Sequence, residues 1–309
     1  MWLLSTIINS NFWKRFTINV RSRIIQKGAW FMTSKYIFLD VDGTLVSYEN
    51  VLPESAVEAI HQAQANGHKV FTVTGRSKAE MYKEILDIGF DGYVGGNGNY
   101  IEVADEVIYH KHLTSEETRK IVDWLLDRNL EFYLESNSGL YGSKNFRERG
   151  RQTVQDYVAY KGKDNAQEAS VESVFPEMLF DQDLYRDDIN KISFVLEFYQ
   201  DYLDAKETFK DYQVGTWGGR GEHALFGDVA LANITKETAI QDLLTHENVD
   251  PKDTFVFGDA KIDIPMFNIC ETGVAMGNGG DEIKAAADYI TDAAEDDGLY
   301  NAFKHFNLI

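Results

Sequence analysis

Two aspartates stand two residues apart, directly after a short apolar run near the fortieth residue of this 309-residue chain. The run is Tyr-Ile-Phe-Leu, the aspartates are Asp40 and Asp42, and Gly43 permits a tight turn after them. One such carboxylate can attack phosphorus, while the other protonates the leaving oxygen and later activates water. The alternative interpretation of the pair is a plain acidic turn.

Two further apolar runs end in groups suited to the same chemistry. Thr74 closes residues 69–74, and Asp259 and Asp263 follow residues 254–257. An open parallel sheet binds its ligands at the carboxyl ends of its strands, so we expect these groups to meet the first pair there. Clustered carboxylates need a cation, and carboxylate, carbonyl and water oxygens suit Mg²⁺.

The elements that must position these groups alternate between strand-like and helix-like patterns. Residues 36–39 and 69–74 predict buried strands, and residues 53–66 predict a helix between them. The capping-box spacing of residues 77–80 predicts a second helix that carries Met81, Ile85 and Ile88 and stops at Gly89. This alternation predicts a parallel sheet with right-handed crossovers.

The middle of the chain departs from this pattern. Residues 101–109 predict a hairpin, a helix follows Thr114, and aromatic-rich strands are expected at residues 131–135, 191–197 and 212–217. The first pattern resumes after about residue 229, with a helix over 236–244, strands at 254–257 and 273–276, and a helix from 281 to about 287. The middle block is therefore predicted to be an α+β unit inserted between two halves of a parallel-sheet domain.

Composition limits the classes of partner. The net charge of −20 argues against nucleic acid, whose phosphates are held by clusters of Lys and Arg. A small phosphorylated metabolite is not excluded, because it needs only a local positive site. No apolar run is long enough for stable membrane insertion, and Cys270 is the single cysteine, so we expect a cytoplasmic protein. The sequence does not indicate an oligomeric state.

Residues 1–32 differ from the rest because they contain five basic residues and no acidic ones. We predict a poorly defined basic and apolar extension, and exclude it from the fold. A membrane-surface or partner-binding amphipathic segment and a cleaved targeting peptide are the alternatives.

Several segments together resemble the haloacid-dehalogenase-like superfamily, and its Cof-type subgroup in particular. Residues 38–45 (Phe-Leu-Asp-Val-Asp-Gly-Thr-Leu) resemble its first signature, and Thr74-Gly75-Arg76 is similar to the second. Lys236 resembles the third signature, residues 258–263 the fourth, and residues 275–291 the subgroup's closing segment. The resemblance implies a Rossmann-like core of residues 33–113 and 230–309, with residues 114–229 as an inserted α+β cap domain.

The resemblance also implies a role for each matching position in a Mg²⁺-dependent phosphatase that acts on sugar phosphates or similar metabolites. Asp40 would be the nucleophile that forms an aspartyl-phosphate, and Asp42 the general acid and base. The implied phosphate-binding residues are Thr74, Gly75 and Lys236. The implied metal ligands are Asp40, the backbone carbonyl of Asp42, Asp259 and, directly or through water, Asp263. Supporting or substrate-binding positions are Arg76, Asn97 and Asn278.

One position departs from the subgroup's pattern. Ile262 stands where the subgroup usually has Asn before the aspartate, and Ile neither donates an amide hydrogen bond nor binds a metal. Loss of such a contact is expected to slow catalysis by about 10–100-fold unless a neighbour such as Asn278 replaces it. Two alternatives therefore accompany the phosphatase: a phosphomutase or other phosphoryl transferase, and a catalytically weakened binding or regulatory protein.

Overall fold

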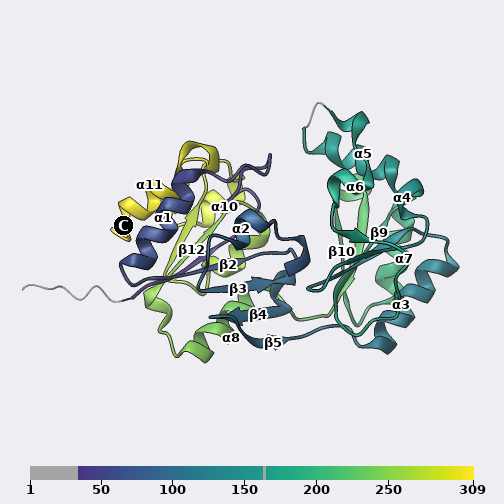
Figure 1. Ribbon diagram of the computed structural model, residues 1–309, viewed down its shortest axis with the longest axis horizontal. Helices are drawn as coiled ribbons and strands as arrows, with labels where there is room; N and C mark the ends of the chain where they lie inside the picture. The colour runs from purple at the N-terminus through teal and green to yellow at the C-terminus, as the bar shows by residue number, and fades with distance from the viewer. Residues whose placement is uncertain (1–33, 163–164) are drawn as a thin grey trace, which may run out of the picture. The chain divides into compact units, whose positions relative to one another are not determined.

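The computed structural model describes residues 34–162 and 165–309, which form one eight-stranded and one six-stranded β-sheet with helices packed on them (Figure 1). The predictions for residues 1–32 lie outside the described residues. Within the described ranges, no helix combines the length and the apolar character needed to cross a bilayer.

The eight-stranded sheet forms the core and has the strand order β14-β13-β12-β1-β2-β3-β4-β5. From β14 to β3 the neighbouring strands run parallel, and β4 and β5 add an antiparallel hairpin at one edge. The strands are β1 (Tyr36–Leu39), β2 (Lys69–Val73), β3 (Gly92–Gly95), β4 (Tyr100–Val103), β5 (Glu106–His110), β12 (Thr254–Gly258), β13 (Thr272–Ala275) and β14 (Tyr289–Ile290).

Helices cover both faces of the core sheet because side chains alternate along each buried strand. Ile37 and Leu39 of β1 pack in a cluster with α1 (Glu54–Ala65) and α11 (Gly298–His305), which contact each other. Phe38 points to the opposite face and packs with α8 (Lys236–Glu247) and α9 (Ile264–Phe267). The predicted α/β class, with a Rossmann-like parallel sheet, is confirmed. The remaining core helices are α2 (Lys83–Leu86) and α10 (Asp281–Ala286).

The six-stranded sheet, which we call the cap sheet, has the order β10-β11-β9-β6-β7-β8. Its strands are β6 (Phe132–Ser136), β7 (Leu140–Gly142), β8 (Met178–Leu179), β9 (Ile189–Val195), β10 (Gln213–Trp217) and β11 (Phe226–Ala230). One face packs against α3 (Ser115–Asp127) and α7 (Tyr199–Thr208), and part of the other against α4 (Phe146–Arg149), α5 (Arg151–Tyr160) and α6 (Val171–Val174). The domain boundaries at 113/114 and 229/230 stay a prediction.

The predicted helix through Met81, Ile85 and Ile88 is wrong as one continuous element. A short 3₁₀ helix, η1 (Lys78–Glu80), is followed by an extended backbone at Met81 and by α2. Arg76 explains the break, since its Nη1 donates to the carbonyl oxygen of Glu80 at 3.2 Å and its guanidinium lies over the ring of Tyr82. These tertiary contacts outweigh the local helical pattern.

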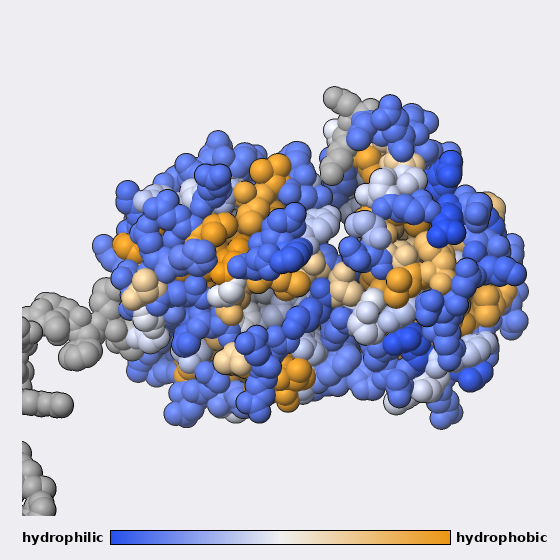
Figure 2. Space-filling model, viewed as in Figure 1, coloured by the Kyte–Doolittle hydropathy of each residue, from blue (hydrophilic) through white to orange (hydrophobic). Residues whose placement is uncertain are grey.

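Most of the surface in Figure 2 is hydrophilic, with separate hydrophobic patches. This agrees with the excess of acidic residues and with apolar side chains that are largely gathered in the cores of the two sheets.

Candidate active site

Asp40 lies at the carboxyl end of β1, where the strand passes into a tight turn. Its backbone N–H donates to the carbonyl oxygen of Phe257 on the neighbouring strand β12, and its side chain is buried. Gly43 allows the turn with φ of +87°, and a Cβ at this position would lie 2.5 Å from Oδ2 of Asp259. Glycine is therefore required both for the backbone conformation and for the close approach of Asp259.

Asp259 and Asp263 come from the loop that follows β12. Asp263 Oδ2 accepts the backbone N–H groups of Asp259 and Ala260, at 3.3 and 3.1 Å, and thereby holds the loop closed. Both carboxylates are buried, and ligand atoms of Asp40, Asp259 and Asp263 all lie within 4.8 Å of one another. The predicted convergence of the two strand ends is therefore observed.

Lys236 enters the same site from the first turn of α8. Thr235 caps this helix by accepting the backbone N–H of Thr238, which fixes where the helix begins. Lys236 Nζ donates to Asp40 Oδ1 at 2.6 Å and to Asp263 Oδ1 at 2.8 Å. Burial lowers the pKa of Lys236, but the charges of Asp40 and Asp263 outweigh burial and raise it above its usual range.

The charges of this group fit a divalent cation. Three carboxylates face one ammonium, so the group has a net charge of about −2 when all three are ionised. Burial and the charge of Asp263 raise the pKa of Asp40 well above its usual range, against the opposing effect of Lys236. Burial likewise raises the pKa of Asp259 to about 6. A dication held by these oxygens would favour the ionised forms, and an all-oxygen donor set is the one that Mg²⁺ prefers.

Asp42 lies apart from this three-carboxylate group. Arg76 donates from Nε to Asp42 Oδ2 at 2.9 Å and from Nη2 to Oδ1 at 2.5 Å, a bidentate pair. Burial raises the pKa of Asp42, but the Arg76 contacts outweigh it and leave the pKa below its usual range. Arg76, predicted only as a supporting residue, is therefore the direct partner of the predicted acid and base.

Thr74, Gly75 and Asn97 lie together beyond the end of β2. Thr74 is buried, and its Oγ1 accepts the backbone N–H of Arg76 at 3.1 Å. The backbone N–H of Asn97 donates to the carbonyl oxygen of Thr74 at 3.0 Å, and a Cβ on Gly75 would lie 3.0 Å from Asn97 Oδ1. This strand neighbours β1, so the three residues belong to the same carboxyl edge of the sheet.

Tyr48 and Thr44 are two contacts of the site that the sequence did not indicate. Tyr48 donates from its hydroxyl to Asp259 Oδ2 at 2.5 Å, and Thr44 Oγ1 donates to Asp259 Oδ1 at 2.9 Å. Both carboxylate oxygens of Asp259 thus accept a protein donor. Thr44 lies within the motif around Asp40, so its place near the site could have been predicted from the sequence. No sequence pattern predicts that Tyr48 contacts Asp259.

Asn278 does not supply the amide contact that Ile262 cannot make. Asn278 donates from Nδ2 to the carbonyl oxygen of Gly43 at 2.7 Å and accepts the backbone N–H of Ala294 at 3.0 Å, so its amide holds backbone. Ile262 is 59% exposed, whereas the adjacent Asp263 is fully buried. The side chain of residue 262 therefore points away from the buried carboxylates.

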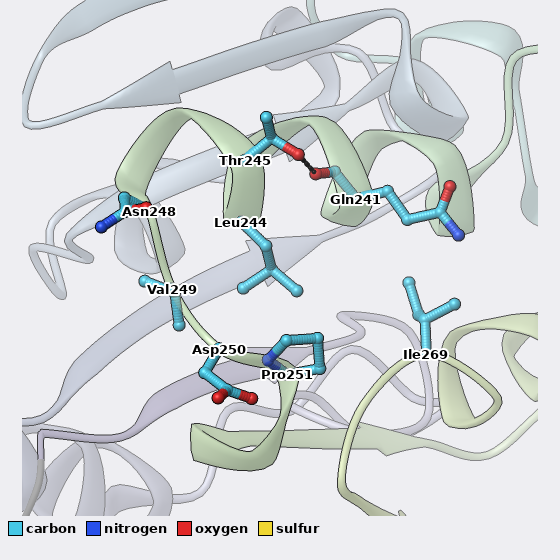
Figure 3. Close-up of a pocket in the computed structure, with 8 residues that line it drawn as sticks. All are labelled: Gln241, Leu244, Thr245, Asn248, Val249, Asp250, Pro251 and Ile269. Atoms are coloured by element: carbon cyan, nitrogen blue, oxygen red, sulfur yellow. Dashed lines mark hydrogen bonds between the residues drawn. The ribbon is translucent and has the colours of Figure 1, made fainter.

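A separate pocket lies at the other end of α8 (Figure 3). Its lining residues are Gln241, Leu244, Thr245, Asn248, Val249, Asp250, Pro251 and Ile269. Asn248 follows the last residue of α8, whereas Lys236 begins this helix, about 18 Å away at 1.5 Å per residue. This pocket is thus distinct from the carboxylate site.

A parallel sheet with buried carboxylates and a lysine at its carboxyl edge defines the chain as an α/β protein with a buried acidic site whose carboxylates could hold a metal ion. Its sequence matches the model of the haloacid dehalogenase-like hydrolases over residues 37–303. The chain therefore belongs to this family, and the predicted membership is confirmed.

Individual relatives agree with the family. The chain is 28% identical over 280 residues to YkrA of Bacillus subtilis, named as a candidate phosphatase, covering 90% of this chain and all of that one. It is 26% identical to phosphatase YwpJ of the same organism, covering 88% of this chain and 99% of that one. The structure of the sugar phosphatase BT4131 is similar with a TM-score of 0.67, at 26% identity and over 89% of this chain and all of that one. At the level of class, the predicted enzyme, a phosphatase, is confirmed.

Proposed function

We propose that this chain is a Mg²⁺-dependent phosphatase that hydrolyses small phosphate monoesters through an aspartyl-phosphate on Asp40. The observation that carries the proposal is the position of Asp40: a buried carboxylate at a strand end, 2.6 Å from Lys236 and grouped with Asp259 and Asp263. The similarity to a sugar phosphatase supports small phosphorylated metabolites as substrates.

In the first step, a carboxylate oxygen of Asp40 attacks phosphorus and the bond from phosphorus to the ester oxygen breaks. Asp42 gives its proton to the departing oxygen, which leaves as an alcohol. Lys236, Thr74 and the backbone at Gly75 hold the phosphoryl oxygens, and the ammonium of Lys236 stabilises their charge as the bond breaks.

In the second step, water attacks the phosphorus of the aspartyl-phosphate while Asp42 takes a proton from that water. The acyl phosphate bond breaks, inorganic phosphate leaves and Asp40 is regenerated. The pairing with Arg76 keeps Asp42 ionised, which is the form that this second step needs. For the first step Asp42 must carry a proton, so we infer that the anionic phosphate of the ester draws donors of Arg76 away from it.

The residues that would hold Mg²⁺ are Asp40, Asp259 and the backbone carbonyl of Asp42, with Asp263 as a direct or water-mediated ligand. When bound, the metal would supply positive charge to the phosphoryl oxygens. Tyr48 and Thr44 support the proposed ligand Asp259 by fixing the orientation of its carboxylate. A cytoplasmic location stays part of the proposal.

The test is release of inorganic phosphate from an aryl phosphate, with and without Mg²⁺, in the wild type and in Asp40→Asn. We expect turnover only with Mg²⁺, and a fall in kcat of at least about 10³-fold in the variant, as for other nucleophile replacements. Asp127→Asn, on the exposed end of α3, is the matched control. Equal rates for the wild type and Asp40→Asn would refute the proposal, whereas phosphate transfer that requires an alcohol acceptor would favour a transferase.

A further inference from the structure

One residue of the cap sheet leaves the regular alternation of its strand. In the ladder between β6 and β9, Glu135 pairs with Lys191 and Ser136 pairs with Ile189, so Asn190 is the extra residue of a β-bulge. A bulge of this kind redirects a side chain away from the regular faces of the sheet. Asn190 is fully buried, so its side-chain amide needs hydrogen-bond partners.

The amide of Asn190 finds its partners on both sides of the contact between the two sheets. Its Nδ2 donates to Ser77 Oγ at 2.9 Å and to Asn137 Oδ1 at 3.2 Å, and its Oδ1 accepts from His110 Nε2 at 2.7 Å. An amide oxygen only accepts, so His110 carries a proton on Nε2. Ser77 lies in the loop after β2 and His110 ends β5, whereas Asn137 follows β6. Asn190 therefore ties the cap sheet to two places on the core.

Two amides from the cap sheet hold the start of the 3₁₀ helix η1. Ser77, which accepts from Asn190, is the N-cap residue of η1 and is itself fully buried. The backbone N–H of Lys78, the first residue of η1, donates to Asn137 Oδ1 at 3.1 Å. The position of η1 on the core therefore depends on contacts that come from the cap sheet.

The helix η1 in turn holds the guanidinium of Arg76. The carbonyl oxygen of Glu80, the last residue of η1, accepts Arg76 Nη1 at 3.2 Å. Nε and Nη2 of the same guanidinium donate to the two carboxylate oxygens of Asp42. Lys161 and Lys236 also act on Asp42 through their charges, but Arg76 bonds to it directly. A continuous series of contacts thus connects the cap amides to the proposed acid and base.

The phosphate-binding part of the same loop is held by the core alone. The backbone N–H of Thr74 donates to the carbonyl oxygen of Val94 at 2.9 Å, and the carbonyl oxygen of Thr74 accepts the N–H of Asn97 at 3.0 Å. The backbone carbonyl of Arg76 accepts the N–H of Gly96 at 2.9 Å. Loss of the cap amides is therefore expected to disturb the Arg76 guanidinium and to leave the residues that bind phosphate in place.

We propose that Asn190 is a positioning residue for the reaction, which acts through Ser77 and η1 to hold Arg76 in the geometry in which Asp42 serves as acid and base. The inference rests on the proposed phosphatase function. A buried amide that only stabilised the fold would not change how the rate depends on the leaving group. The dependence on the leaving group is therefore the quantity to measure.

The experiment compares kcat/KM for benzyl phosphate and p-nitrophenyl phosphate, two esters with rings of similar size, in the presence of Mg²⁺. p-Nitrophenolate leaves readily without a proton, whereas the benzyl oxygen leaves only when Asp42 protonates it. In Asn190→Ala we expect kcat/KM to fall by about 10–100-fold for benzyl phosphate, as for a misplaced acid, and by less than about threefold for p-nitrophenyl phosphate. The second step, which is common to both esters, does not enter this ratio because kcat/KM covers the steps up to the aspartyl-phosphate.

A second variant removes the other partner of the proposed contact. Ser77→Ala takes away the hydroxyl that accepts from Asn190 and should lower the same ratio, which keeps the test decisive if Asn190→Ala does not fold. The double variant should fall no further than the stronger single variant, since both changes act through one contact. Asn145→Ala, an exposed amide before α4 of the cap, is the control and should keep the wild-type ratio. Thermal unfolding shows which variants fold.

The outcomes separate this inference from the function on which it rests. Equal falls for both esters, or an unchanged ratio in the variants that fold, would assign Asn190 a purely structural role and overturn the inference alone. Additive effects in the double variant would overturn it as well, because Asn190 would then not act through Ser77. The same holds if the wild type turns over p-nitrophenyl phosphate and not benzyl phosphate. No Mg²⁺-dependent turnover of either ester by the wild type would overturn the proposed function and the inference together.

Discussion

Each of the two sheets holds a lysine that pairs with carboxylates, and the surroundings of these two lysines differ. Lys236, at the edge of the core sheet, is 6% exposed and lies between two carboxylates at 2.6 and 2.8 Å. Lys191, on the face of the cap sheet, is 20% exposed and pairs with the single carboxylate of Glu135 at 3.1 Å. The core lysine is thus held between two carboxylates, whereas the cap lysine pairs with one.

The difference follows from how each sheet presents side chains. Parallel strands end at one edge of a sheet. The charged side chains in the loops after β1 and β12 and at the start of α8 therefore lie close together there. Antiparallel strands instead present alternate side chains across a face, where charges are spread in rows. The first arrangement brings several charges to one point, whereas the second keeps charges apart along the strands.

Lys236→Met should produce the largest effect, because it removes the positive charge from the core site. The buried carboxylates would lose their partner, which costs about 3–5 kcal/mol in the free energy of unfolding without metal. Loss of the phosphate-binding ammonium should lower kcat by about 10²–10³-fold. Thermal unfolding with and without Mg²⁺, together with phosphate release, measures both effects.

Lys261→Met is the matched control for this substitution, since Lys261 lies in the loop after β12 but is 75% exposed. It should change neither quantity appreciably. If Lys236→Met unfolded at the same temperature as the wild type in the absence of Mg²⁺, the two carboxylates beside Lys236 would not depend on its charge. The contrast between Lys236 and Lys191 would then be wrong.

Tyr48→Phe tests whether the core site depends on neutral donors as well as on Lys236, because it removes one hydrogen-bond donor without changing a charge. The hydroxyl that orients Asp259 at 2.5 Å would be lost, and such supporting contacts are worth about 10–100-fold in metal affinity or activity. Calorimetric titration of Mg²⁺ should show the weaker binding directly. Tyr160→Phe, on the exposed end of α5, is the control, and unchanged Mg²⁺ affinity in Tyr48→Phe would show that Asp259 does not need this donor.

Glu80→Gln tests the contact between η1 of the core and β6 of the cap sheet through the pH dependence of stability. Burial and the charge of Glu135 raise the pKa of Glu80 from 4.5 to about 8 in the folded protein. Between these values the folded state keeps a proton that the unfolded state has released, so stability falls as pH rises through this window. The variant should therefore unfold at a higher temperature than the wild type near pH 8, and at a similar one near pH 4.5. Parallel curves of Tm against pH would exclude Glu80 as the cause.

The sequence predicted the core site better than the paired charges of Glu135 and Lys191 on the cap sheet, for a physical reason. Asp40, Lys236, Asp259 and Asp263 are tied to strand ends and a helix start, so their order along the chain nearly determines that they meet. The pairing of Glu135 with Lys191 depends instead on strand register, and it joins residues far apart in the chain.

Local patterns failed where tertiary contacts decided the conformation. The capping-box spacing of residues 77–80 was real, and Glu80 does accept the backbone N–H of Ser77 at 2.7 Å. The helix nevertheless ends there, because Arg76 engages the carbonyl oxygen of Glu80. Tyr48 was missed for the opposite reason: an aromatic residue in a loop has no local pattern, and only the turn at Gly43 brings it to Asp259.

Ile262→Asn should have the smallest effect, although the sequence pattern alone predicts a gain. Residue 262 is 59% exposed while its neighbour Asp263 is fully buried and bound by Lys236, so an amide at position 262 would face away from the carboxylates. We expect kcat to change by less than about threefold, since a surface substitution of this kind is usually worth under 0.5 kcal/mol. Phosphate release from p-nitrophenyl phosphate at saturating Mg²⁺ is the measurement, with Ile290→Asn at the exposed end of β14 as the control. A tenfold or larger gain specific to position 262 would mean that its side chain turns into the site when the ester binds.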